Sequence, residues 1–315
     1  NGLNDRTKRA SFVHWLQCSK ADVVCLQETH AASHGDIRSW CRNSGFTVAS
    51  SSISNKRAGT AILVGSQHQV HQVWRDEEGR LTQVELSIGE HRFRVVSLYA
   101  PSRNPARNQF LRSVSDYLDL SIPTIICGDF NSVLDPDLDR LHPPTYQRSA
   151  PSPHAESIPA LQSLMSSTQT FPVWRTLHPN VRAYSWVHGS GSVASRIDMI
   201  LAPIGMRDQI KECEYRTASF VADHRYLYLE SSLEGFEPRG PGYWKLNTSL
   251  LRDDKYRDLV AAFWSFWKTQ EKSGDFSSLL DWWDMGKSLV REATRSFACV
   301  KAMTQSSAKK LLQRQ

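Results

Sequence analysis

The sequence predicts an α+β protein in which mixed β-sheets are covered by helices on the outside and are followed by a helical extension. Three observations lead to this class: short apolar runs rich in β-branched residues, stretches that alternate apolar and polar residues, and amphipathic stretches with helical spacing between them. Beyond residue 233 only helical patterns remain. The chain is therefore expected to hold one mixed domain over 1–232 and a helical segment over 233–315.

The first 232 residues alternate between strand and helix patterns. Expected strands lie at 23–26, 60–64, 69–74, 81–88, 93–99, 124–127, 184–187, 197–201 and 226–229, and expected helices lie at 9–19, 107–120 and 158–166. The stretch 134–159 is rich in Pro, Ser, Asp and His, which predicts a long surface loop. Several strands alternate in polarity, as expected for antiparallel strands with one covered face.

Two long helices are predicted at 253–269 and 276–300, after a cluster of Gly and Pro at 235–242. Five of the ten Trp residues of the chain lie beyond residue 232. Paired aromatic side chains on helices usually pack against one another, so we expect packing rather than stacking on bases.

Charge is concentrated near the end of the chain, although the net formal charge is only +6. Residues 285–315 hold seven Lys and Arg but a single acidic residue, Glu292. Such a tail indicates either a polyanionic partner or a solvated helix face, and charge alone leaves both open. The six Cys are scattered without a CxxC pair, which predicts neither a zinc site nor a disulfide framework and favours a reducing compartment. No apolar run is long enough to cross a bilayer, so a membrane partner is not expected.

Polar residues that suit chemistry stand in or beside predicted strands at four places. The first strand stops at Gln27-Glu28, and a later one stops at Gly128-Asp129-Phe130-Asn131. An acid, Asp198, lies within an otherwise apolar strand, and the pair Asp223-His224 comes near the end of the domain. A carboxylate beside an amide suits a base that takes a proton from water, and a His paired with a carboxylate can hold a phosphate oxygen.

The order of these motifs, together with Tyr99-Ala100-Pro101, resembles the endonuclease/exonuclease/phosphatase superfamily. The resemblance implies the DNase-I-like four-layer α/β sandwich, with two mixed sheets face to face and helices outside. Within the superfamily, the segments 1–4, 27–30, 57–63 and 195–198 resemble the apurinic-type endonuclease of LINE-type non-LTR retrotransposons. Residues 242–247 and the Trp-rich helices resemble the linker toward the reverse transcriptase, which implies a fragment of a longer protein whose first strand is truncated.

The resemblance implies a role for each matching residue. It assigns catalysis to Asp129, Asn131, His224, Asp198 and Tyr99, metal binding to Glu28, Asp223 and Asn1, and nucleic-acid contacts to Ser102, Asn104, Ser195 and Arg196. Asp129 would activate the attacking water, and His224, with Asp198 behind it, would bind the scissile phosphate. Tyr99 would donate to a phosphate oxygen. The implied cofactor is Mg²⁺, with Mn²⁺ as a possible substitute.

The implied reaction is nicking of double-stranded target DNA, which leaves a 3′-hydroxyl that primes reverse transcription. Element RNA would contact the C-terminal segment or domains beyond it, and the protein would act in the nucleus after synthesis in the cytoplasm. Loops at 51–57, 135–159 and 187–195 are the candidates for reading the target. The last is rich in Gly and Ser and has few hydrogen-bonding side chains, which favours readout of DNA shape over base contacts. Two alternatives stay open: an RNA 3′-exonuclease of the deadenylase kind, and a nucleic-acid-binding module that acts through the basic tail.

Overall fold

The structure is a computed structural model that describes residues 2–53, 57–141, 157–218, 222–233, 246–272 and 278–312. Contacts divide the chain into two units, Asn1–Pro241 and Gly242–Gln315, and each is described by itself. The predicted boundary near 233 borders residues 234–245, which lie outside the described residues, so it stays a prediction.

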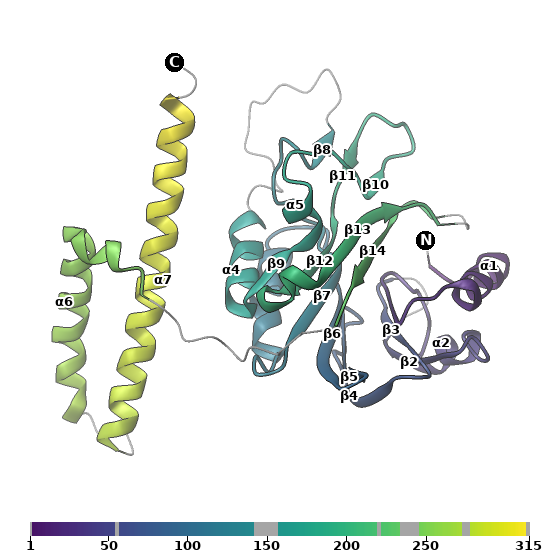
Figure 1. Cartoon of the computed structure of the whole chain (residues 1–315), viewed down its shortest axis with the longest axis horizontal. Coiled ribbons are helices and arrows are strands. Elements are labelled where there is room, and N and C mark those ends of the chain that lie inside the picture. The colour runs from purple at the N-terminus through teal and green to yellow at the C-terminus, as the bar shows by residue number, and fades with distance from the viewer. Residues whose placement is uncertain are drawn as a thin grey trace. The chain divides into compact units, whose positions relative to one another are not determined.

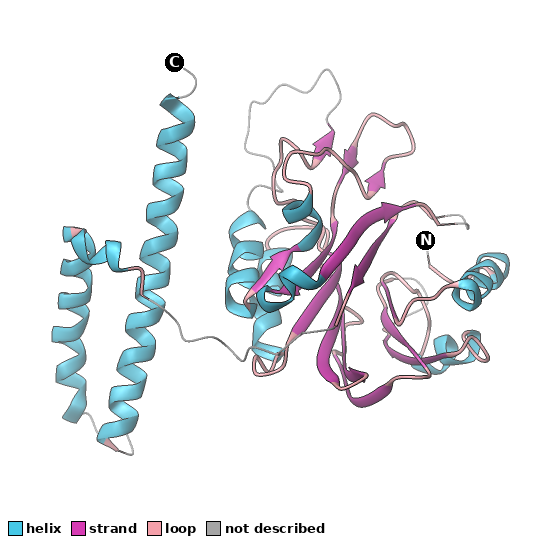
Figure 2. Cartoon of the chain, viewed as in Figure 1, coloured by secondary structure: helices cyan, strands magenta, loops and turns pink. Residues whose placement is uncertain are grey.

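A six-stranded sheet forms the centre of the first unit, with the strand order β4-β5-β6-β7-β12-β9 (Figures 1 and 2). Its strands are β4 (Gln69–Arg75), β5 (Leu81–Ile88), β6 (His91–Tyr99), β7 (Thr124–Asp129), β12 (Asp198–Pro203) and β9 (Thr170–Pro172). Only β6 and β7 run parallel; the other neighbours are antiparallel. The sheet is therefore mixed, as the alternating patterns predict.

Three smaller sheets complete the strands of this unit. The order β1-β3-β2 is formed by β1 (Val23–Leu26), β3 (Thr60–Gly65) and β2 (Phe46–Ser51), and β13 (Ile210–Arg216) pairs with β14 (Tyr226–Ser231). Three two-residue strands, β10 (Trp186–Val187), β11 (Ala194–Ser195) and β8 (Arg140–Leu141), form the last sheet. All three sheets pair in antiparallel fashion.

Apolar side chains point to both faces of the sheets, so the unit is built in layers, with one core between the sheets and others beneath the outer helices. Between the sheets, Ile62 and Val64 of β3 pack against Val84, Phe93 and Val95 of the six-stranded sheet. On the outer face of β1-β3-β2 lie α1 (Arg6–Cys18) and α2 (His34–Trp40), and on the outer face of the six-stranded sheet lie α3 (Ala106–Ser113) and α4 (Ile158–Thr168). A short α5 (Val173–Leu177) packs with β9, β12 and β13. The predicted four-layer sandwich is confirmed.

In its described residues the second unit forms two α-helices, α6 (Asp254–Thr269) and α7 (Leu279–Leu312), with 3-10 turns at Thr248–Arg252 and Gln270–Lys272. The indole N–H of Trp267 donates to the carbonyl of Trp282 at 3.3 Å, and the indole of Trp282 donates to the carbonyl of Trp267 at 3.3 Å. Both side chains are buried, so packing is their role in this unit, as expected. Among the described residues, no helix has the length and apolar character that a membrane span requires.

Some elements differ from the sequence prediction. The strands β2, β8, β9, β11 and β13 and the helices α2 and α5 are not predicted. In β13 the alternation of apolar and charged residues is interrupted by a bulge between Ile210 and Glu212, which hides the period-two signal. The predicted helix 107–120 ends at Ser113 and continues as a 3-10 turn to Tyr117. The prediction of a surface loop at 134–159 is wrong for Asp139, because its side chain is fully buried. Residues 142–156 of that stretch lie outside the described residues.

Gly128 is required where β7 runs beside β6, one residue before the strand-end acid Asp129. Its φ is +152°, and an added Cβ would lie 1.9 Å from the carbonyl oxygen of Leu98 on β6. We expect Gly128→Ala to lower the free energy of unfolding by at least about 2 kcal/mol, because strained backbone and a clash with a neighbouring strand add. Urea unfolding measures this, with Gly205→Ala as the control, since a Cβ there meets nothing within 4 Å. Equal effects of the two substitutions would contradict the prediction.

Candidate active site

Three of the predicted catalytic residues lie in one row across neighbouring strands. Tyr99 at the end of β6 pairs in register with Asp129 at the end of β7, and Asp129 pairs with Asp198 at the start of β12. Residues in register on adjacent strands point to the same face of a sheet. The sheet therefore brings together side chains from distant parts of the sequence, since Tyr99 and Asp198 are 99 residues apart.

Glu28 reaches this row from the other sheet. It follows β1, and Oη of Tyr99 donates a hydrogen bond to its Oε1 at 2.5 Å. The preceding Gln27 ties the sheets together, because its Nε2 donates to Oγ of Ser97 at 2.9 Å, and that hydroxyl donates to the carbonyl of Leu26 at 3.1 Å. Burial and the carboxylate of Glu28 raise the pKa of Tyr99, so the phenol stays a donor. The hydroxyl therefore orients Glu28 in this structure.

The turn after β7 holds Asp129 and Asn131 together. The backbone N–H of Asn131 donates to Oδ1 of Asp129 at 2.8 Å, and Nδ2 of Asn131 donates to the carbonyl of Ala100 at 2.9 Å. Asn131 has a φ of 47° and Glu28 a φ of 50°, so both adopt the left-handed conformation that L residues disfavour. Strain of this kind is typical of functional sites, where it aims a side chain.

The acidity of Asp129 follows from its surroundings. Burial raises its pKa well above the ordinary value, and the negative charge of Asp198 adds to that effect. The positive charge of His224 and the N–H of Asn131 oppose it. A buried carboxylate with a raised pKa is a stronger proton acceptor than a solvated one, which is the property a general base requires.

His224 lies against Asp198 as the sequence predicts, with Nδ1 at 2.8 Å from Oδ2. Burial disfavours the charged ring, but the carboxylates of Asp198, Asp129 and Asp223 outweigh burial and raise the pKa of His224 to about 9. The backbone of His224 also forms an isolated bridge to Trp186. At neutral pH the ring is therefore an imidazolium whose Nε2 is the remaining donor for an anionic group.

A metal ion would find suitable ligands here. One ligand atom each of Asp129, Asp198 and His224 lies within 4.8 Å of the others. A protonated His is a poor ligand, whereas carboxylate oxygens are the preferred ligands of hard divalent cations. The neighbouring carboxylates of Asp129 and Asp198 also repel each other, and a cation would relieve that repulsion. The negative charge of Glu28 also raises the pKa of Asp129, so the carboxylates that meet here from the two sheets, Glu28 among them, fit a hard divalent cation.

The family resemblance assigns metal binding to Glu28, Asp223 and Asn1, and the structure describes the first two of these residues. Glu28 stands at the edge of the row through its bond to Tyr99. Asp223 is exposed and lies next to His224 in the sequence. Asn1 lies outside the described residues.

The four residues assigned to nucleic-acid contacts fall into two groups. Ser102 is exposed, and Asn104 is half-buried and accepts a hydrogen bond from Oγ of Ser157 at 3.2 Å. Ser195 and Arg196 are buried, with exposures of 5% and 1%. The assignment of Ser195 and Arg196 to direct nucleic-acid contacts is therefore corrected, since neither side chain faces solvent.

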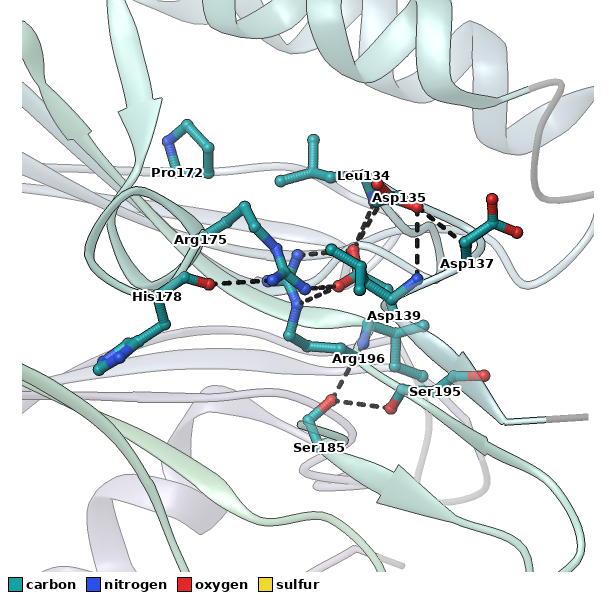
Figure 3. Close-up of polar contacts among 12 residues, drawn as sticks. Leu134, Asp135, Asp137, Asp139, Pro172, Arg175, His178, Ser185, Ser195 and Arg196 are labelled. Carbon is teal, nitrogen blue, oxygen red and sulfur yellow. Dashed lines mark hydrogen bonds and ion pairs between the residues drawn. The ribbon is translucent and has the colours of Figure 1, made fainter. Parts of the chain in front are cut away.

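Arg196 instead belongs to a buried ionic centre around Asp139 (Figure 3). Its Nε donates to Oδ1 of Asp139 at 2.8 Å and its Nη2 donates to Oδ2 at 2.7 Å, while Arg175 also donates to Oδ1. The N–H groups of Leu134 and Asp135 donate to Oδ2 at 3.1 and 3.0 Å. Sequence reasoning missed this centre because Asp139 stands in a stretch with loop composition. An Arg two residues before the strand acid Asp198 was the only available signal.

Comparisons with known proteins agree on the family. A model of the endonuclease/exonuclease/phosphatase family matches residues 1–208. The "Transposon TX1 uncharacterized 149 kDa protein" of Xenopus laevis is 27% identical over 307 residues, which cover 94% of this chain and 22% of that protein. This chain therefore spans about a fifth of that relative. An exodeoxyribonuclease of Bacillus subtilis (strain 168) is 24% identical over 248 residues, covering 71% of this chain and 93% of the relative.

The fold has solved relatives. An AP endonuclease from Archaeoglobus fulgidus superposes with a TM-score of 0.59 at 20% sequence identity, covering 73% of this chain and 96% of that chain. At this identity the likeness establishes the DNase-I-like fold alone.

Proposed function

The chain belongs to the endonuclease/exonuclease/phosphatase family, and from that premise we propose that it is a Mg²⁺-dependent DNA endonuclease that nicks one strand of a target duplex. The observation that carries the proposal is the row of Tyr99, Asp129 and Asp198 with His224 against Asp198. It offers a buried base and a cationic donor within reach of one phosphate.

The residues of the row divide the reaction between them. Asp129 accepts a proton from the attacking water, and Asn131 holds Asp129 in place through its backbone N–H. The imidazolium of His224 donates from Nε2 to a non-bridging oxygen of the phosphate and stabilises the charge that develops there. Asp198 fixes the ring from the other side through Nδ1. The water oxygen forms a bond to phosphorus as the bond between phosphorus and O3′ breaks. The products are a 5′-phosphate and a 3′-hydroxyl, whose oxygen takes its proton from solvent.

Glu28 is the residue that would hold Mg²⁺, with Asp223 as a second proposed ligand and Mn²⁺ as a substitute. When bound, the ion would supply positive charge that neutralises the phosphate and the leaving oxygen. Oη of Tyr99 orients Glu28 for this purpose. This arrangement favours an orienting role for Tyr99 over direct donation to a phosphate oxygen.

We expect Tyr99→Phe to raise the Mg²⁺ concentration for half-maximal nicking by about tenfold or more, because loss of a partner that orients a ligand typically costs 10- to 100-fold in metal affinity. A Mg²⁺ titration of the initial nicking rate measures this. Tyr117→Phe is the matched control, since Tyr117 is 55% exposed and its ring stacks on Trp74. An unchanged Mg²⁺ requirement with a lower rate at saturating Mg²⁺ would instead support direct contact with the phosphate.

The proposed substrate and setting follow from the similarity to the TX1 transposon protein. That similarity covers 94% of this chain and includes the Trp-rich helices, so we propose that the chain is part of a LINE-type retrotransposon protein. The 3′-hydroxyl at the nick would prime reverse transcription of element RNA. The reaction would take place in the nucleus, after synthesis in the cytoplasm, and the RNA would bind the helical segment or domains beyond it.

Nicking of supercoiled plasmid tests the proposal. We expect conversion to the relaxed circle in the presence of Mg²⁺ and none in EDTA. A covalently closed circle has no end, so degradation of linear DNA or labelled RNA without plasmid nicking would support an exonuclease. Retention of plasmid without cleavage, with strong dependence on salt, would support a binding module.

A further inference from the structure

Ser185 lies next to the row but has no part in the proposed chemistry. It immediately precedes β10 and is fully buried. Its Oγ accepts hydrogen bonds from the backbone N–H groups of Ile197 at 3.0 Å and Asp198 at 3.1 Å. Its own N–H donates to the carbonyl of Ser195 at 3.0 Å, so Ser185 contacts the chain just before the start of β12 (Figure 3).

Ser185 also contacts the segment that carries His224. The backbone N–H of Arg225 donates to the carbonyl of Ser185 at 2.7 Å. The next residue, Trp186, forms a β-bridge to His224. One short segment therefore binds the backbone at Asp198 and the backbone at His224, the two residues whose side chains form the pair.

The acceptor matters because of where the two N–H groups lie. β11 ends at Ser195 and β12 begins at Asp198, so the chain between them is outside the regular strands. The carbonyl of Asp139 accepts from the N–H of Arg196 at 2.9 Å, and the N–H groups of Ile197 and Asp198 turn to the Ser185 hydroxyl. Buried backbone donors need a partner, and without this hydroxyl both would have to move toward another one.

We propose that Ser185 is a positioning residue for phosphodiester hydrolysis: it fixes the backbone at Asp198 and so the place of the His224 ring, without touching the substrate. This inference rests on the proposed function. Displacing a catalytic group by about 1 Å can cost about 100-fold in rate. Loss of the Ser185 hydroxyl should therefore lower the nicking rate strongly, although Ser185 takes no part in the reaction itself.

The first test compares substitutions of Ser185 at a temperature well below unfolding. We expect Ser185→Ala to lower kcat for nicking about 10- to 100-fold with KM nearly unchanged, and Ser185→Thr, which keeps the hydroxyl, to restore most of the loss. Ser44→Ala is the matched control, because Ser44 is also buried but its hydroxyl has no partner among the described residues. Equal kcat values for Ser185→Ala and Ser44→Ala would overturn the proposal.

A double-substitution cycle separates positioning from general damage. If Ser185 acts through His224, then Ser185→Ala should lower the small residual rate of the His224→Ala variant less than twofold. A further loss as large as the one in the parent would overturn the proposal, because it would show an effect independent of His224.

A spectroscopic measurement keeps the inference independent of activity. The Nδ1–H proton of His224, held by Asp198, should give a low-field NMR signal that is assigned by its absence in His224→Ala. We expect the signal to persist in Ser44→Ala and to shift or vanish in Ser185→Ala. If the parent does not nick DNA but the signal responds in this way, the proposed function fails and the positioning role stands. An unchanged signal in Ser185→Ala overturns the positioning role whatever the activity.

Discussion

Replacing Asp129 by Asn is expected to lower the initial rate of plasmid nicking by about 10³-fold, within the range of 10² to 10⁴ that a positioned general base contributes. Asn has nearly the same shape and its Oδ1 can still accept from the N–H of Asn131, but it cannot take a proton from water. A gel assay of supercoiled plasmid at saturating Mg²⁺ measures the loss.

Thermal unfolding shows whether such a loss comes from chemistry. Burial and Asp198 raise the pKa of Asp129, so its ionised form is disfavoured in the folded state. We therefore expect Asp129→Asn to leave Tm unchanged or to raise it. Asp116→Asn is the matched control, because Asp116 is exposed on the surface, and it should leave rate and Tm unchanged. A nicking rate within tenfold of the parent would remove Asp129 from the role of base.

Asp139→Ala is expected to lower the free energy of unfolding by about 3–5 kcal/mol. The carboxylate is completely buried, and its removal leaves the guanidinium of Arg196, itself 1% exposed, without a counter-charge. The corresponding fall in Tm is about 10 °C or more for a unit of this size. Urea and thermal unfolding measure both values, and Asp208→Ala, at an exposed position, should change neither.

The charges themselves are tested by a second substitution and by pH. Adding Arg196→Met to Asp139→Ala should cost less than the sum of the single effects, because the buried guanidinium that loses its carboxylate in Asp139→Ala is then removed as well.

Burial opposes ionisation of Asp139, but Arg196, the N–H of Asp135 and Arg175 outweigh burial and hold its pKa below the ordinary value. The stabilisation is therefore complete above the unfolded pKa of about 4 and is lost as the pH falls through the lower folded pKa. Additive effects and a difference that persists in strong acid would both contradict the ionic account.

Much of the fold was predictable because its signals are local. Strands such as β5 and β6 alternate apolar residues toward two covered faces, and α6 and α7 show helical spacing. The missed strand β13 is a different case, since a bulge breaks its alternation. Asp139 was placed in a surface loop, because composition reports the average behaviour of a segment and not the burial of one side chain.

The residues of the candidate site were predictable from the sequence, whereas their contacts were not. Residue type and position at strand ends were enough to select Glu28, Asp129, Asn131, Asp198 and His224, and their order supports the family. Their roles stay predictions. The partner of Tyr99, the burial of Arg196 and the hydroxyl of Ser185 under Asp198 were not accessible in this way.

The sequence by itself determined the class of the fold, the family and the set of polar residues that can act, because each of these depends on residue type, local period and order along the chain. The tertiary structure alone decided which of those residues touch. Strand register sets Tyr99, Asp129 and Asp198 side by side, and the packing of two sheets brings Glu28 to Tyr99. Register and sheet packing arise from contacts between segments far apart in the chain, which is why Arg196 turns out to neutralise a buried Asp139 and Ser185 to hold the backbone of Asp198.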